Sequence, residues 1–433
     1  MKPARRYLLV LLCSLMVRSA GAQQALPVYS PFTTASFRQA FYRGLLTWSI
    51  RNNLAKTLPD TDNAYDFQSA FWPMELVLYK SPYVRQRLNY AFSCIDSLST
   101  DFQRGLLELV YTNWPGTFDA PVEDLLRRTR SPEILALSAE YLRRDRPDSA
   151  VRDLVQEQLA RDPFDTLQSD PVLGALMQRL QPAFPPQALP PLRDLLSEGF
   201  AAGLPVLYSF QRPDRNFPGL AVVRGPDGRF VRNPDSGYFH VAQLARAISN
   251  LPYYLINGNT PQGIFRMSGL AVSSSRFIGP TTNIQLSMPC EIPADSFVIN
   301  APPQDTAWSR QVYSQLLPES WRGYAPVFQS YTAGKAGRTA IIAHGTTIDP
   351  AYYKGQPYYP ETPSLGCLCC YETWSADSGR RLQSDQQQLV DALRSTGATS
   401  GYAVVIELPG TGPVRLSEIR AYLKQAEQLD GQP

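Results

Sequence analysis

Two side chains near the end of the chain, Cys367 and His344, are of the types that carry out nucleophilic catalysis. A thiol attacks carbonyl carbons well only after it loses its proton, and a nearby imidazole is the commonest group that takes this proton at neutral pH. The chain contains only two histidines, His240 and His344. Only His344 is followed by a glycine, Gly345, which leaves room for close backbone contacts. The pair therefore predicts acyl transfer through a thioester.

A glycine also precedes the cysteine. Gly366 permits a sharp turn that exposes backbone N–H groups. We expect the N–H groups of Gly366 and Cys367 to hold the negative oxygen that forms when a thiolate attacks a carbonyl. His240 has no comparable motif around it, and we interpret it as a structural residue that opens a helix.

Two ordered motifs extend this pattern. The first motif combines His344-Gly345-Thr346 with the later stretch Ser364-Leu365-Gly366-Cys367. The second motif lies upstream of both stretches and reads Thr260-Pro261-Gln262-Gly263-Ile264-Phe265. Together they resemble the signature of the L,D-transpeptidase catalytic domain, often called the YkuD domain, between residues 204 and 408. The resemblance implies a mainly β, sandwich-like fold with the histidine at the end of a strand and the cysteine on a nearby loop.

The same resemblance implies a reaction. The donor would be a peptidoglycan stem tetrapeptide, cut before its terminal D-alanine, and the acceptor would be the side-chain amine of another stem, which gives a 3–3 cross-link. Cys367 would be the nucleophile and His344 the base, oriented by the carbonyl of Gly345 or by Asp349. Gly366 and Ser364 would shape the oxyanion loop. This chemistry requires no cofactor and no metal.

The chain differs from the family pattern at two positions, where Leu365 and Cys369 replace a frequent histidine and arginine. The substitute guanidinium would come from one of four arginines, Arg266, Arg276, Arg380 or Arg381. The stretch between the histidine and the cysteine is either a lid over the cleft or a rigid surface loop. Its candidate substrate-binding tyrosines are Tyr352, Tyr353, Tyr358 and Tyr359.

Other functions stay open at this point. With water in place of the second amine, the same site would be an L,D-carboxypeptidase or an amide hydrolase of cell-wall peptides. A non-catalytic cell-wall binding protein, with the N-terminal half as its adhesive part, is a different class. A zinc site formed by Cys367, Cys369, Cys370 and His344 is the least favoured, because C-x-C-C lacks the paired spacing of structural zinc sites.

The remaining sequence predicts an α+β multidomain chain. Residues 23–200 carry helical periodicity, as in the helix that begins at Ser131-Pro132, and their role is open. A proline-rich linker, 182–191, precedes the mainly β domain, 201–412, and a helical tail covers 413–433. We expect strands at 206–210, 220–223, 263–267, 284–288, 339–343 and 402–408, and helices at 241–251 and 385–393.

The first 22 residues read as a secretory signal that is cleaved near Ala22, which predicts a periplasmic or cell-envelope location. Without this segment the formal net charge falls from +3 to −1, so neither nucleic acid nor anionic lipid is an expected partner. No later segment is apolar enough for a membrane span. Five cysteines remain, and Cys94 and Cys290 are either buried thiols or a disulfide between the two halves.

Overall fold

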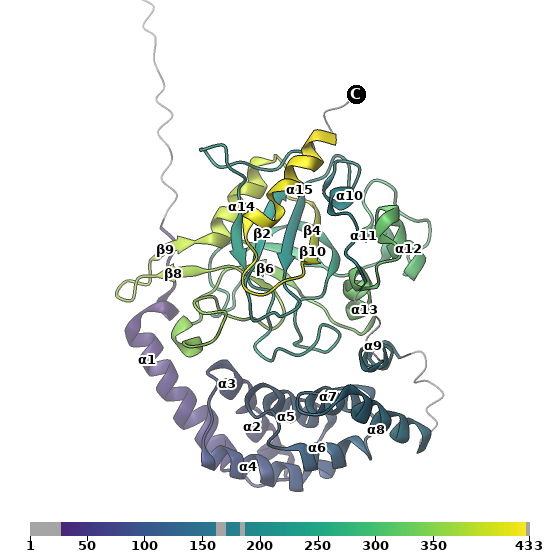
Figure 1. Ribbon diagram of the computed structural model, residues 1–433. Coiled ribbons are helices and arrows are strands. Elements are labelled where there is room, and N and C mark those ends of the chain that lie inside the picture. The colour runs from purple at the N-terminus through teal and green to yellow at the C-terminus, as the bar shows by residue number, and fades with distance from the viewer. Residues whose placement is uncertain (1–26, 162–169, 182–186, 430–433) are drawn as a thin grey trace, which may run out of the picture.

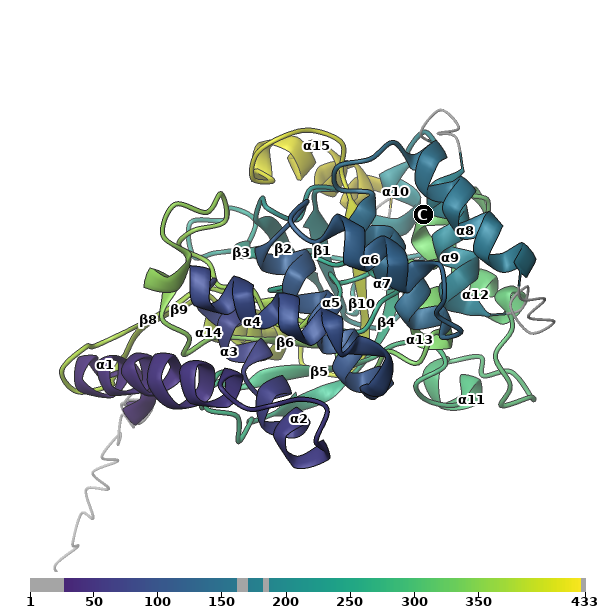
Figure 2. The same cartoon turned by 90° about the horizontal axis from the view of Figure 1, so that it is seen from below.

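The computed structural model describes residues 27–161, 170–181 and 187–429. Residues 1–22, predicted as a secretory signal, and residues 182–186 of the predicted linker lie outside this part. A layer of helices lies beneath a part that is built on a large sheet, which confirms the α+β class (Figure 1). Seen from below, α4, α5 and α6 lie across the β part (Figure 2).

The helical half covers most of the chain up to residue 180. The serine and proline pattern at Ser131-Pro132 does begin a helix, because Ser131 Oγ accepts a hydrogen bond from the Ile134 N–H. In the described residues its helices are α1 (Ala35–Gly44, continued by a π-helix at Leu45–Asn52), α2 (Thr61–Gln68), α3 (Phe71–Leu76), α4 (Pro82–Ser93), α5 (Thr100–Asn113), α6 (Asp119–Leu126), α7 (Pro132–Leu142), α8 (Asp148–Arg161) and α9 (Pro171–Leu180).

The second half is organised by an eight-stranded sheet in the order β3-β2-β1-β10-β4-β5-β6-β7. The pairs β1–β10 and β6–β7 are parallel and the others antiparallel. The strands are β1 (Val206–Gln211), β2 (Gly219–Arg224), β3 (Val241–Gln243), β4 (Gly263–Ala271), β5 (Asn283–Ser287), β6 (Ile342–His344), β7 (Leu368–Cys369) and β10 (Gly401–Glu407), with a separate hairpin of β8 (Glu372–Trp374) and β9 (Arg381–Ser384).

Both faces of the sheet are buried. Alternate residues of β1 point to opposite faces, so that Val206 and Tyr208 join one core while Leu207 joins the other. Helices α10 and α15 cover the first face, and α14 covers the second. The helices of this half are α10 (Leu192–Leu196), α11 (Ala294–Phe297), α12 (Arg310–Gln315), α13 (Gln329–Lys335), α14 (Asp385–Ser395) and α15 (Leu416–Leu429).

Two sequence predictions are corrected here. The expected helix at 241–251 is wrong: after β3 the chain forms isolated bridges at Leu244 and Ala247 and then bends, and His240 is an exposed residue that opens no helix. The N–H groups of this segment donate to other parts of the chain, Leu244 to Cys369 O and Ile248 to Ser364 O, both at 2.8 Å. The strand expected at 339–343 begins only at Ile342, because Ala340 has a φ of +60°.

The two halves interlock. A segment of the β half, residues 250–259, enters the helical half and places Leu251, Tyr254 and Leu255 in its hydrophobic core. On the other side, α1 runs from the helical layer to the β8–β9 hairpin (Figure 1). Arg38 of α1 pairs with Asp349 at 3.6 Å. Within the described residues, no helix combines the length and the apolar character needed to cross a bilayer.

Candidate active site

Strands β6 and β7 bring the candidate base and nucleophile together. The two strands are parallel, with Ala343 opposite Leu368 and His344 opposite Cys369. Residues opposite each other in a parallel pair face the same side, and residues two apart on a strand do too. Cys367, one residue before β7, therefore projects from the same face as His344.

The imidazole of His344 is fixed by the backbone. Its Nδ1 lies 2.5 Å from the carbonyl oxygen of Gly345, which is one of the two orienting groups expected from the sequence. The other, Asp349, instead accepts from the Ala351 N–H and pairs with Arg38. Burial lowers the pKa of His344 below its ordinary value, and the Gly345 carbonyl offsets part of this effect. The imidazole is therefore neutral at neutral pH, with Nε2 as its basic nitrogen.

The thiol of Cys367 is half-buried and protonated at rest. Burial raises its pKa, although the Ile342 N–H and the charge of Arg338 act in the opposite direction. Its Sγ donates to Ala340 O at 3.6 Å, and the hydrogen bonds found among the described residues include none between this thiol and His344. The resting pair is thus a neutral thiol and a neutral imidazole, and the thiol is turned toward the Ala340 carbonyl.

The turn before the cysteine is closed by Ser364. Its Oγ accepts from the Gly366 N–H at 3.0 Å and donates to the Cys367 carbonyl at 2.9 Å. The Gly366 N–H is therefore occupied, and its expected role as an oxyanion donor is corrected; the Cys367 N–H stays a prediction. Gly366 has a φ of +111°, and a Cβ there would overlap the guanidinium of Arg338 and the carbonyl of Gly258.

Arg338 is the positive charge beside the nucleophile, and sequence reasoning missed it. It is 5% exposed and donates to the carbonyls of Tyr253, Asn259 (2.9 Å) and Gly258 (2.8 Å). No carboxylate of the described residues pairs with it. Burial lowers its pKa to about 10, so it remains charged at neutral pH. An uncompensated buried cation next to a thiol favours the thiolate.

The four arginines expected to substitute for the family guanidinium are elsewhere. Arg266 bonds Ser400 Oγ at 3.0 Å and is separated from β6 by β5. Arg276 stacks on Phe41 and Phe277. The remaining two belong to the β8–β9 hairpin region, where Arg380 forms a bridge with Tyr29 and Arg381 donates to Thr281 Oγ1 at 2.9 Å.

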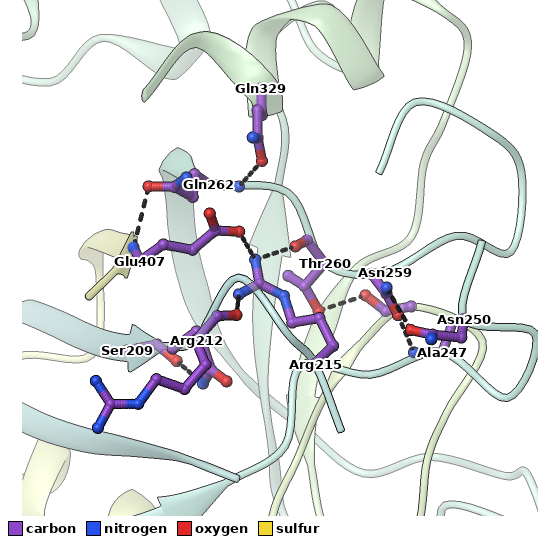
Figure 3. A network of polar contacts seen from close by, with 12 residues as sticks. Ser209, Arg212, Arg215, Ala247, Asn250, Asn259, Thr260, Gln262, Gln329 and Glu407 are labelled. Atoms are coloured by element: carbon purple, nitrogen blue, oxygen red, sulfur yellow. Dashed lines mark hydrogen bonds and ion pairs between the residues drawn. The ribbon is translucent and has the colours of Figure 1, made fainter. Parts of the chain in front are cut away.

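The upstream motif supports the turn of the nucleophile. Thr260 is fully buried, and its Oγ1 donates to the Gly366 carbonyl at 2.9 Å. Figure 3 shows the network that holds this motif in place: Arg215 donates to the Thr260 carbonyl at 3.1 Å and pairs with Glu407 at 2.7 Å, while Gln262 accepts from the Glu407 N–H. The T-P-x-G segment is therefore part of the scaffold of the site.

The tyrosines between the histidine and the cysteine are mostly internal. Tyr353 and Tyr358 are 0% and 1% exposed and pack together with Leu244, so these two rings do not fit the expected role in substrate binding. Tyr352 is half-buried and stacks on Tyr42 of α1. Tyr359 is exposed and stays a candidate. The helical half thus covers this loop directly.

The other cysteines among the described residues are free thiols, so the alternative of a disulfide between Cys94 and Cys290 is wrong. Both are half-buried, and burial raises the pKa of Cys290 to about 11. Cys369 and Cys370 are buried beside the site. Within the described part of the chain, no three histidine, cysteine or acidic side chains converge closely enough to share a metal ion.

Comparisons of the chain with models of known families, with curated proteins and with solved structures found no match.

Proposed function

We propose that the protein is a cysteine acyltransferase of the L,D-transpeptidase type that acts on peptidoglycan stem peptides. The observation that supports this best is the placement of Cys367 and His344 on one face of adjacent parallel strands, with His344 Nδ1 held by the Gly345 carbonyl. A neutral imidazole beside a thiol can act as a general base. The motif resemblance supplies the substrate class, and the specific fold of that family is part of this proposal.

In the proposed first half-reaction, Nε2 of His344 takes the proton of Cys367 while the sulfur attacks the peptide carbonyl between the third stem residue and D-alanine. The charge of Arg338 and the Ile342 N–H stabilise the developing thiolate. The tetrahedral intermediate collapses to a thioester, and the D-alanine amine leaves with the proton from His344. In the second half-reaction, an amine of another stem attacks the thioester and gives up a proton to His344; the C–S bond breaks, and His344 returns the proton to the sulfur of Cys367.

Mass spectrometry of muropeptides tests this proposal. Purified tetrapeptide stems incubated with the wild type should give a 3–3 cross-linked dimer, and Cys367→Ala should give none because the covalent route is lost. Cys94→Ala is the matched control, since it removes a half-buried thiol of the helical half, and it should retain full activity. Tripeptide without dimer would instead identify an L,D-carboxypeptidase. Unchanged stems with the wild type would contradict an enzymatic role.

A further inference from the structure

Glu372, the first residue of β8, is a buried carboxylate behind the loop that follows the candidate base. It is 4% exposed and accepts three hydrogen bonds, from Ser384 Oγ at 2.5 Å, Thr281 Oγ1 at 2.6 Å and the Thr346 N–H at 2.9 Å. A buried carboxylate is costly unless donors of this kind satisfy it. The sequence motifs do not include this residue.

One peptide group connects Glu372 with His344. The peptide between Gly345 and Thr346 presents its carbonyl oxygen to His344 Nδ1 and its N–H to the Glu372 carboxylate. The next carbonyl, that of Thr346, accepts from Trp374 Nε1 at 2.8 Å, which fixes the orientation of the loop. Glu372, the peptide and the imidazole therefore form a continuous chain of hydrogen bonds.

These hydrogen bonds explain why the H-G-T motif has a glycine, Gly345, after the histidine. A Cβ on Gly345 would overlap the carboxylate of Glu372, although the backbone of Gly345 has no left-handed φ that would itself require glycine. Only a residue without a side chain lets the carboxylate approach the peptide so closely.

Hydrogen bonds in series polarise one another in a low-dielectric interior. A negative Glu372 draws the Thr346 N–H toward itself and makes the Gly345 carbonyl oxygen a stronger acceptor. This oxygen then holds the proton on Nδ1, leaves Nε2 as the base, and stabilises the positive charge that the imidazole acquires.

We propose that Glu372 is a positioning residue of the catalytic pair and acts on His344 through the Gly345–Thr346 peptide. This inference deepens the proposed function and its kinetic part rests on it. Glu372 does not touch substrate or the sulfur in this scheme; it sets the tautomer and the basicity of the imidazole.

The ionisation of Glu372 gives the inference a pH signature. Burial raises the pKa of Glu372 to about 7, while the hydrogen bonds from Ser384, Thr281 and Thr346 and the charge of Arg381 on β9 oppose this rise. The other titratable groups that face it are Cys369 at β7, the following Cys370, and His344 through the peptide. Above neutral pH the Glu372 carboxylate should therefore be mostly negative, and the hydrogen bonds that link it to His344 should then be polarised.

Histidine NMR tests the connection without any substrate. The chain has two histidines, so His240→Asn leaves only the His344 signals to follow. In that background the His344 ring shifts should show an inflection near pH 7 from Glu372, besides the imidazole's own titration at lower pH. Glu372→Gln keeps an acceptor for the Thr346 N–H but removes the charge, so the inflection near neutral pH should disappear. Its persistence in Glu372→Gln, or its absence without this substitution, would overturn the inference.

Kinetics on stem peptides provide the second measurement. Glu372→Gln should lower kcat on the order of tenfold with little change in KM, as is typical when a group that orients a catalytic histidine is lost. Glu418→Gln is the matched control. Glu418 accepts from a backbone N–H, as Glu372 does, but it pairs with Arg212 and belongs to α15. The kcat of this variant should not change. An unchanged kcat in Glu372→Gln would contradict the inference. If the wild type has no activity, the proposed function fails while the NMR result still decides the role of Glu372.

Discussion

At the scale of single residues, the Cys367 thiol and the His344 imidazole are both neutral at rest, because burial opposes charge on each. Arg338 is then the main fixed charge beside the sulfur. In the proposed reaction, the rate of attack depends on how far this cation favours the thiolate of Cys367 when the proton moves to His344.

We expect Arg338→Met to slow alkylation of Cys367 by iodoacetamide on the order of tenfold at neutral pH, because loss of the neighbouring charge raises the thiol pKa further. In both proteins the rate should increase as pH rises toward the thiol pKa. The measurement is the pH dependence of labelling, followed by peptide mapping of Cys367. Arg266→Met is the control, since Arg266 is on β4 and away from the sulfur. Equal rates in wild type and Arg338→Met would contradict the role of Arg338.

The sequence was sufficient to single out Cys367 and His344 as a candidate pair, because each lies in its own short motif. Arg338 and Glu372 could not be found in this way. Arg338 is placed by carbonyls of Tyr253, Gly258 and Asn259, which are far away in the chain, and Glu372 reaches His344 only through a peptide group. Neither relation leaves a local pattern of residue types.

At the scale of elements, the turn before Cys367 depends on glycine for two separate reasons. Gly366→Ala should cost about 1–3 kcal/mol from the positive φ alone, and the overlap with Arg338 adds to this cost and displaces the guanidinium. We expect a lower Tm and a loss of activity. Gly337→Ala separates the two effects, because Gly337 has a φ of +86° but open space around it, so it should lower Tm and retain activity. Full activity in Gly366→Ala would show that the turn is not needed.

The buried pair of Arg215 and Glu407 holds the T-P-x-G segment, and the two partners should respond differently to substitution. Glu407→Gln leaves a buried guanidinium that cannot lose its proton, so we expect a loss of about 3–5 kcal/mol in unfolding free energy. Arg215→Met should cost less, because Glu407 can become neutral. Denaturant titration measures both. Asp66→Asn, whose exposed side chain pairs with the exposed Lys56 at 3.3 Å, should cost about 1 kcal/mol or less. A larger loss of unfolding free energy in Arg215→Met than in Glu407→Gln would contradict this account.

Most strands of the sheet were predictable because their apolar residues are flanked by turn signals. The conformation of the segment after His240 was not predictable, because its apolar residues repeat with the period of a helix. Tertiary contacts decide its conformation: Leu244 and Ile248 take their acceptors from the cysteine loop. Such contacts override local periodicity.

At the scale of the whole molecule, the helical half supports the site. It surrounds Leu251, Tyr254 and Leu255, and the same segment ends at Gly258 and Asn259, whose carbonyls hold Arg338. From residue patterns alone the role of this half stayed open, because the contact between the halves is made by side chains from both.

The hydroxyl of Tyr254 donates to the buried Glu140 at 2.7 Å, so Tyr254→Phe should lower the unfolding free energy by about 1–3 kcal/mol and reduce activity. Tyr253→Phe is the matched control, because in the described part of the chain the Tyr253 hydroxyl has no hydrogen-bond partner; its stability should be close to that of the wild type. Denaturant unfolding and stem-peptide turnover measure the two effects. Equal stability of the two variants would argue against this contact between the halves.

Intact-protein mass spectrometry of the acyl-enzyme tests the central claim most directly. The wild type mixed with a tetrapeptide stem should gain the mass of the acyl tripeptide, and peptide mapping should place it on Cys367 as a thioester that hydroxylamine removes. Cys367→Ala should gain no mass, while Cys94→Ala should behave as the wild type. An adduct on another residue, or no adduct in the wild type at any time point, would contradict catalysis through the Cys367 sulfur.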